Sequence, residues 1–464
     1  MADELFDREE FRLATEPASA EHDSAMQDST VPAGAAARGK ARLRVPQRQQ
    51  VEMRYASLDE LLPSDHPARA VWELVSRLDL SAWLAEVQAV EGICGRNATD
   101  PRLLLALWVY ATVDGVASAR ELARRCELHL AYQWLCGAVT VNHHLLSDFR
   151  AESGPRLDEL LTQLVAGLLS QGLVTLNRVA QDGMRVRASA GRSSFRRRGR
   201  LRECLQAARE QVETLKQLAD SDPQQCTAQQ QAARERAAAE RAERLEAALA
   251  ACDEVEQKRR QSRSRHKDEP KGSSTDPEAR IMQMADGGYR PAYNVQFATD
   301  VASGLIVGVD VTNSGSDNGQ LRPMADQLRH RYGQSPQEYL ADGGFMNLKD
   351  LDHLETEHRC LVYLPLKDEE KQLAAGKDPA ARTRHDTDAT AAWRVRMRSD
   401  AAKAVYKLRA QSAEWVNAVC RNHNLWRLPV RGKTRCRAVA LLHALAHNLL
   451  RGLRLQNLRL QNLP

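Results

Sequence analysis

The hydrophobic pattern of this chain changes near residue 175, and the change limits which folds are open to it. Over residues 51–174, Leu, Trp and Ala recur at i, i+3 and i+4 spacing, which predicts a compact all-helical domain. From residue 175 the apolar runs become short and β-branched, as in LNRVAQDGMRVRAS, and helical patterns alternate with them. The chain is therefore predicted to be an α+β protein, with a helical domain ahead of a mixed β-sheet core.

Several helix starts can be placed in the helical domain. Asp100 followed by Pro101 is typical of an N-cap and a first helical residue. Ser118 and Glu121 have the spacing of a capping box, and Asn142 can cap HHLLSDFRAE. Helices starting at Ser118 and Asn142 would resemble a helix-turn-helix arrangement, although ordinary helical bundles show the same pattern. The polar positions of this segment that could contact DNA phosphates or base edges are Arg120, Arg124, Arg125, His143, His144 and Arg150.

The second part is predicted to form a mixed sheet with helices rather than a regular βαβ repeat. After the strand near Asp182, further strands are predicted at YNVQFATD (293–300), LIVGVDVT (305–312), EYLAD (338–342) and CLVYLPL. Helices are predicted at QLRPMADQLRHRY, at LKDLDHLETEH and, as one long helix, over about 391–424.

A long insertion, at about residues 196–270, follows the first strand. Residues 201–220 and 227–265 are strongly helical, rich in Ala, Arg and Glu, and SDPQQ separates them. The simplest interpretation is an antiparallel helical hairpin with its turn near Pro223.

Two basic clusters flank the predicted hairpin, RRRGR at 196–200 and KRRQSRSRHK at 258–267. If the helices pair antiparallel, their ends meet, and the clusters form a positive patch near the strand that bears Asp182. Arg196, Arg197 and Arg198 are then candidate DNA contacts. The alternative is a solvated pair of charged helices with no partner.

Charge is unevenly spread along the chain. Residues 1–30 contain nine acidic and two basic residues, a net charge of −7. Because the whole chain has a net charge of +5, residues 31–464 carry a net charge of +12. Residues 1–50 lack an apolar period and are predicted to be a disordered tail. An acidic tail ahead of a basic body suggests a polyanion partner, although ordinary surface charge explains it equally well.

The cysteines and apolar runs favour a reducing compartment. Nine cysteines are scattered without any CxxC pair, which argues against a structural zinc site. No signal peptide and no apolar run of the ~20 residues that span a bilayer are found, so a cytoplasmic protein without membrane contact is expected.

Three acidic residues have local settings suited to holding a metal. Asp182 in VAQDGMRV and Asp342 in EYLADGGF sit where short strands meet glycine, and Glu414 lies in a long helical pattern. In a sheet that places the first strand beside the fourth, both aspartates could project at one edge, and Glu414 could join them. Carboxylates favour Mg²⁺ or Mn²⁺ over zinc, and three of them can bind two ions for in-line displacement at phosphorus. Taken singly, each Asp could be a turn residue and the Glu a surface residue.

The chain resembles bacterial insertion-sequence transposases of the Asp-Asp-Glu (DDE) type over most of residues 50–452. The resemblance rests on the order of DPRLLLALWVYATVDGVASARELARRC, WLCG, NHHLLSDFR, QDGMRVRASAG, DPEARIMQMADGGYRPAYNVQFATD, YLADGGF, AEWVNAVCRNHNLWRLPVRG and HALAHNLLR. It implies an InsH-like helical N-terminal domain, a ribonuclease-H-like catalytic core over residues 175–452, and a C-terminal tail at residues 453–464 without a counterpart.

The same resemblance implies roles for individual residues. Asp182, Asp342 and Glu414 match the three metal ligands, and Tyr406 and Arg409 match the Tyr and Arg that precede the glutamate in this family. Arg421 stands where a lysine often follows it, which keeps the charge but alters the geometry.

The function that the resemblance implies is metal-dependent cleavage and strand transfer of double-stranded DNA by a homo-oligomer assembled on paired element ends. A catalytically inactive, transposase-derived DNA-binding protein is the alternative, and a nuclease that cleaves without joining strands is a third possibility.

Overall fold

The structure is a computed structural model that describes residues 55–92, 94–221, 228–261 and 268–461, together with Gln49, Val51 and Met53. The chain separates into two units, residues 1–55 and 56–464, and the second is considered below. The predicted disordered tail therefore lies almost wholly outside the described residues, as do the hairpin turn near Pro223 and residues 262–267 of the second basic cluster.

The N-terminal part of the second unit is all-helical, as predicted. Its helices are α1 (Leu58–Leu61), α2 (Pro67–Ser76), α3 (Ser81–Ala85), α4 (Pro101–Val113), α5 (Ala119–Leu128), α6 (Leu130–Cys136), α7 (His143–Glu152) and α8 (Gly154–Ser170). Asp100 and Asn142 cap α4 and α7 through their side chains, which confirms both predicted starts.

The start of α5 follows the prediction only in part. Ser118 Oγ accepts a hydrogen bond from the Glu121 amide, but the Glu121 carboxylate binds Arg124 and Arg125 rather than turning back to the cap. The expected two-helix arrangement also contains a further helix, α6, between α5 and α7. It packs against α5, and α5 in turn packs against α7.

The sheet has six strands in the order β4-β5-β1-β7-β8, with β6 also paired to β5. The strands are β1 (Arg178–Arg187), β4 (Arg280–Gln283), β5 (Tyr289–Asp300), β6 (Ile306–Thr312), β7 (Glu338–Leu340) and β8 (Leu361–Tyr363). β1 is antiparallel to β5 and parallel to β7, so the sheet is mixed. This is the α+β, ribonuclease-H-like arrangement that was expected, and it sets the first long strand beside the fourth.

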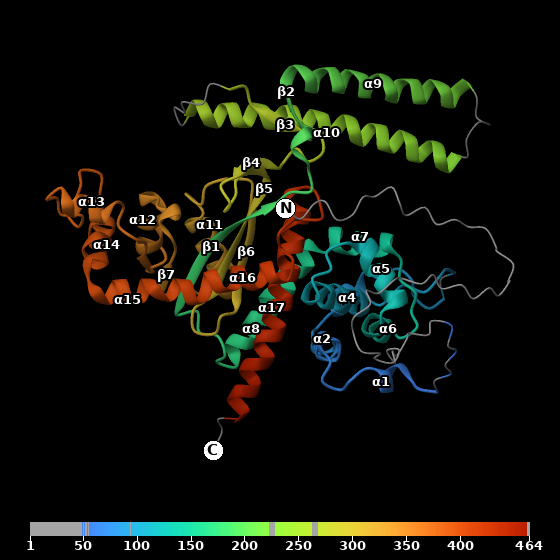
Figure 1. Ribbon diagram of the computed structural model, residues 1–464, viewed down its shortest axis with the longest axis horizontal. Coiled ribbons are helices and arrows are strands. Elements are labelled where there is room, and N and C mark those ends of the chain that lie inside the picture. Colours follow the sequence, from blue (N-terminus) through green and yellow to red (C-terminus); the bar gives the residue numbers. More distant parts are fainter. Residues whose placement is uncertain are drawn as a thin grey trace, which may run out of the picture. The chain divides into compact units, whose positions relative to one another are not determined.

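Helices cover both faces of the sheet and its β6 edge (Figure 1). The helices of this part of the chain are α11 (Leu321–Tyr332), α12 (Leu348–Thr356), α13 (Glu369–Ala374), α14 (Asp388–Arg398), α15 (Asp400–Arg409), α16 (Trp415–Asn422) and α17 (Lys433–Gln461). The Asn448 side chain of α17 donates to the Ile306 carbonyl and accepts from the Ile306 amide. These two hydrogen bonds satisfy the backbone groups of Ile306 on the edge strand β6. One hydrophobic core runs from Leu62 in the helical part, through the strands, to Leu449.

The single long helix predicted over residues 391–424 is wrong. Ser399 adopts an extended conformation, and its side chain caps α15 through the Ala402 amide, so α14 and α15 are separate helices. A π-helical segment, Ala410–Glu414, then separates α15 from α16. The predicted C-terminal tail is also helical as far as Gln461, since α17 continues through it.

The insertion forms the predicted helical hairpin. α9 (Arg198–Ser221) and α10 (Ala228–Gln261) lie side by side (Figure 1) around a small core that includes Leu201, Leu205 and Leu245. Arg209 pairs with Glu246 at 2.7 Å, and Arg198 near the start of α9 pairs with acids near the end of α10, so the helices are antiparallel. Two short strands, β2 (Phe195–Arg197) and β3 (Lys271–Ser273), pair at its base. Sequence patterns did not predict these strands or β4, each of which has four residues or fewer.

Candidate active site

The pairing of β1 with β7 brings the two predicted aspartates to the same level of the sheet. Ala180 lies opposite Leu340 in this parallel pair. Two residues further along each strand direction are Asp182 and Asp342, and side chains two residues apart on a strand share a face. Asp342 follows β7 directly and caps the short 3₁₀ turn Gly343–Phe345, its Oδ1 accepting from the Gly344 amide at 2.8 Å.

Arg409 connects this pair to Glu414. Its Nη1 lies 3.9 Å from Asp182 Oδ1, and its Nη2 donates to Glu414 Oε1. Burial lowers the pKa of the Arg409 guanidinium, but the nearby Tyr406, Asp182, Glu414 and Asp342 together raise it above its usual value. Asp182 and Glu414 therefore share one cation, with Arg409 only 14% exposed and Glu414 48% exposed.

The π-helical segment explains how Arg409 and Glu414 meet. Residues five apart in an α-helix lie about 140° apart around its axis, whereas i→i+5 hydrogen bonding brings the fifth residue back over the first. Ser412 Oγ within the segment donates to the carbonyls of Leu408 and Arg409, which the wider turn leaves available. Such segments often occur at functional sites.

Asp182 is largely buried, with 18% of its side chain exposed. Burial raises its pKa from 3.8 to about 6; Arg409 opposes this rise, and the nearby Asp342 charge adds to it. Asn417 on α16 donates from Nδ2 to Asp182 Oδ2 at 2.9 Å, and the Gly183 amide donates to Oδ1. A carboxyl with this pKa exchanges its proton readily for another cation near neutral pH.

The donor set around Asp182 fits a hard divalent cation. Three carboxylates are present, and Asn417 Oδ1 is buried without a hydrogen-bond partner among the described residues, so an oxygen atom remains to be satisfied. The carboxylate oxygens of Asp182, Asp342 and Glu414 do not all lie within 4.8 Å of one another in the described part of the chain. Arg409 holds Glu414 in this arrangement.

Sequence reasoning missed Asp317, a buried acid on the other face of the sheet. Its Oδ1 accepts from Asn294 Nδ2 and Gln296 Nε2 at 2.7 Å each, and Arg185 Nη2 donates to its Oδ2 at 2.8 Å. It packs so closely on Gly183 that a Cβ there would lie 2.1 Å from Asp317 Oδ1. It therefore fixes the strand position next to Asp182. The only sequence signal was a Ser- and Gly-rich loop, SGSDNG, after the third strand.

Asn417, also missed, had a clearer signal. It lies three residues after Glu414, and residues three apart in a helix share a face.

The predicted DNA contacts of the helical domain differ in their surroundings. Arg120, Arg124 and His144 are exposed. Arg124 binds Glu121, whereas Arg125 binds both Glu121 and Asp114. His143 is half-buried, with its ring centroid 4.1 Å from that of His144.

Arg150 corrects the prediction. It is buried, its Nη1 donates to the Ala117 carbonyl, and its guanidinium lies 4.3 Å from the Trp108 ring. Desolvation lowers its pKa to about 10. Its guanidinium is used inside the domain and has little surface left for the expected DNA contact.

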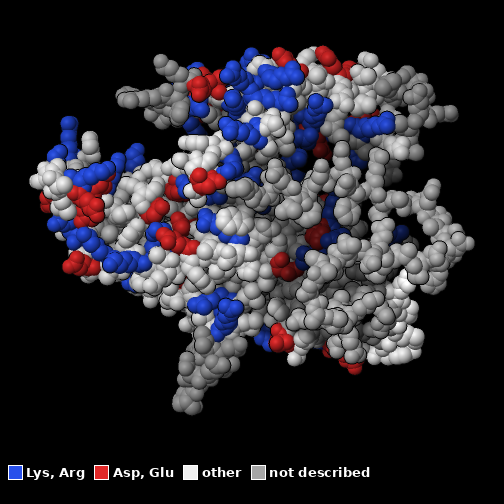
Figure 2. Space-filling view, in the orientation of Figure 1, with Lys and Arg blue, Asp and Glu red and all other residues white. Residues whose placement is uncertain are grey.

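The three arginines at the hairpin base are not equivalent. Arg198 pairs with Asp253 and Glu256 at 2.6 Å each, whereas Arg197 is 70% exposed and lies 3.9 Å from Glu269. Arg196 is half-buried beside Cys204. The ends of the two helices do meet, but acids interleave the basic residues. Figure 2 shows Lys and Arg side chains gathered over this part of the hairpin.

Two further predicted contacts lie on α15 and α16. Arg421 on α16 lines a shallow pocket with Arg185 and Gly183, and its guanidinium lies over the Trp426 ring at 5.6 Å. Tyr406 on α15 is half-buried, with the Arg409 guanidinium 5.8 Å from its ring.

Two family models match the chain. One, described as a transposase DDE domain, matches residues 258–449, and the other, described as a transposase domain (DUF772), matches residues 56–152. The first includes Asp342 and Glu414, and the second covers most of the helical part. No curated protein and no solved structure matches the chain. Among the described helices, none has the length and apolar character that a membrane crossing requires.

Proposed function

Because the chain belongs to the insertion-sequence transposases of the DDE type, we propose that it cuts the ends of its own mobile element and joins the freed 3′-hydroxyls to target DNA. Asp182, Asp342 and Glu414 are the proposed metal ligands. The observation that carries this proposal is the strand register that sets Asp182 level with Asp342, together with the Arg409 guanidinium that lies between Asp182 and Glu414.

Each residue around the carboxylates has a role that follows from its contacts. Asn417 holds one oxygen of Asp182 and so fixes the direction of the other. Arg409 neutralises part of the negative charge that would otherwise oppose the approach of a phosphodiester. Arg421 and Arg185 line the adjacent pocket and are suited to bind backbone phosphates.

Mg²⁺, or Mn²⁺ in its place, held by the three carboxylates would activate the attacking water or 3′-hydroxyl and stabilise the leaving 3′-oxygen. Asp182 must be ionised to take part. Since its pKa is about 6, protons compete for it at mildly acidic pH.

DNA binding is proposed to use both the helical domain and the hairpin. Arg120 and His144 are exposed on α5 and α7, and Arg197 is exposed at the hairpin base. Paired element ends require at least two active sites, so a homo-oligomer on DNA is expected.

A nicking assay on DNA carrying the flanks of the gene tests the proposal. Asp182→Asn, Asp342→Asn and Glu414→Gln should each abolish Mg²⁺-dependent nicking and leave DNA binding largely intact, because each removes one ligand charge at nearly constant shape. Asp286→Asn is a matched control: it removes a carboxylate from the exposed turn between β4 and β5, where Asp286 pairs only with Arg290.

The outcomes separate the alternatives. Nicking that survives all three substitutions would refute the proposed ligands. Binding without cleavage by the unmodified protein would favour a non-catalytic DNA-binding protein. Cleavage without strand joining, tested with a labelled target duplex, would favour a nuclease.

A further inference from the structure

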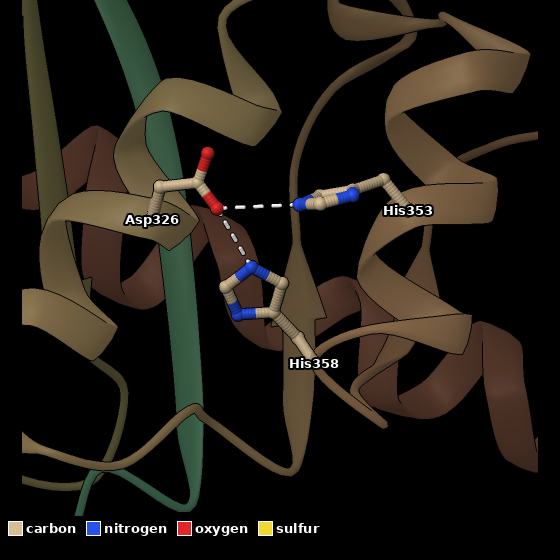
Figure 3. A group of neighbouring side chains, drawn as sticks. All are labelled: Asp326, His353 and His358. Atoms are coloured by element: carbon tan, nitrogen blue, oxygen red, sulfur yellow. Dashed lines mark hydrogen bonds and ion pairs between the residues drawn. The ribbon is translucent and has the colours of Figure 1, made fainter.

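A second cluster of metal-ligand side chains lies apart from the three carboxylates. Asp326 projects from α11, His353 from α12, and His358 from the connection between α12 and β8 (Figure 3). One ligand atom from each lies within 4.8 Å of the others, and no other group of three such residues meets this condition among the described residues.

The atoms of this cluster point toward one oxygen. His358 Nε2 lies 2.8 Å from Asp326 Oδ1, and His353 Nε2 lies 3.3 Å from the same atom. Ligand distances of about 2.0–2.2 Å in tetrahedral zinc sites set neighbouring ligand atoms roughly 3.3 Å apart. The His353–Asp326 contact already has this spacing, and the His358–Asp326 contact reaches it by opening about half an ångström.

The surroundings orient the cluster for coordination. His358 is 2% exposed, and its Nδ1 lies 2.8 Å from Ser335 Oγ. The hydroxyl can accept a hydrogen bond from Nδ1–H, and in that tautomer the lone pair of Nε2 is available to a metal ion. Arg322 lies 3.5 Å from the other oxygen of Asp326, Oδ2, and leaves Oδ1 to the imidazoles. Asp326 is 47% exposed, so the site is open to solvent for entry and for a water ligand.

We propose that Asp326, His353 and His358 bind a divalent transition metal ion of the zinc class, with water completing its coordination. Two imidazoles and one carboxylate suit borderline ions, whereas Mg²⁺ prefers an all-oxygen set. The ion would connect α11 to α12 and to the α12–β8 connection. This site is chemically distinct from the three carboxylates, and its existence does not depend on DNA cleavage.

Zinc binding to the full chain tests the site. Protein stripped of transition metals is titrated with Zn²⁺ by calorimetry in a buffer that contains Mg²⁺ throughout, and Co²⁺ is used as a spectroscopic probe of tetrahedral coordination. His353→Ala and Asp326→Asn should each weaken Zn²⁺ affinity by more than about 100-fold, and Ser335→Ala by about 10-fold.

His330→Ala is the matched control, because it removes an exposed imidazole from α11 outside the cluster. The site is supported if His330→Ala keeps its Zn²⁺ affinity, His353→Ala and Asp326→Asn lose theirs, and all variants keep the circular dichroism spectrum of the parent. The proposal is overturned if the unmodified chain binds no Zn²⁺, or if His353→Ala and Asp326→Asn bind it as tightly as the parent does.

Discussion

Replacing Asp182 with Asn is expected to stabilise the fold while it abolishes DNA cleavage. Burial raises the pKa of Asp182 from 3.8 to about 6, and the side chain is only 18% exposed. The difference between these two values corresponds to roughly 3 kcal/mol of unfolding free energy. The ionised carboxylate is therefore an unfavourable group in the folded chain, held there by the rest of the structure.

The pH dependence of this effect has a definite sign. The folded state binds the proton more tightly, so the stability contributed by protonated Asp182 is fully present below pH 3.8 and is lost as pH rises through about 6. Asn stays neutral at every pH. The variant should exceed the parent by about 3 kcal/mol near pH 8, by about half as much near pH 5, and by almost nothing below about pH 4.

Guanidinium chloride unfolding at about pH 8 and pH 5, followed by tryptophan fluorescence, measures the difference. Glu121→Gln should behave in the opposite way, because Arg124 and Arg125 lower the pKa of Glu121 to about 2 and its charge stabilises the fold at neutral pH. An Asp182→Asn variant no more stable than the parent near pH 8, or equally stabilised at both pH values, would refute the reasoning.

Two further predictions concern packing and charge. Gly183→Ala should destabilise the chain by about 1–3 kcal/mol, because its Cβ would lie 2.1 Å from the Asp317 carboxylate, which three hydrogen bonds hold in place. Gly167→Ala in α8 is the control: its Cβ would meet nothing within 4 Å, so this variant should be neutral or stabilising in the same denaturation assay. Arg197→Ala should weaken DNA binding and flatten its salt dependence more than Arg198→Ala does, because Arg198 is already paired with two acids. Equal salt slopes in filter-binding assays would contradict the second expectation.

Local signals carried much of the fold. Asp100 and Asn142 announce helix starts because a side-chain oxygen beside an apolar period satisfies free amides. The long strands β1, β5 and β6 were recognisable because their β-branched and apolar segments are longer than a turn. β2, β3 and β4 were not, because FRR, KGS and RIMQ contain no apolar run longer than two residues, whereas the equally short β7 and β8 lie in the apolar segments EYLAD and CLVYLPL.

Features that depend on tertiary contacts were out of reach of the sequence. Arg150 looked like a surface arginine, and only the position of Trp108 on α4 decides that it is buried. Asp317 and the cluster around His358 join segments separated by many residues, and no spacing rule connects them. The π-helical segment inserts one extra residue into a turn, and nothing in AQSAE distinguishes it from an α-helix.

That extra residue leads to a last prediction, because it places Arg409 between Asp182 and Glu414. Arg409 is the largest of the effects that lower the pKa of Asp182 against burial, so replacing it with Met raises that pKa further. At a limiting metal concentration, where protons compete with the ion, the acid limb of the nicking rate should move to higher pH in Arg409→Met. Arg409→Lys keeps the positive charge and should move it back toward the parent. An acid limb at the same pH in all three proteins would mean that Asp182 is not the titrating group, or that Arg409 does not act on it.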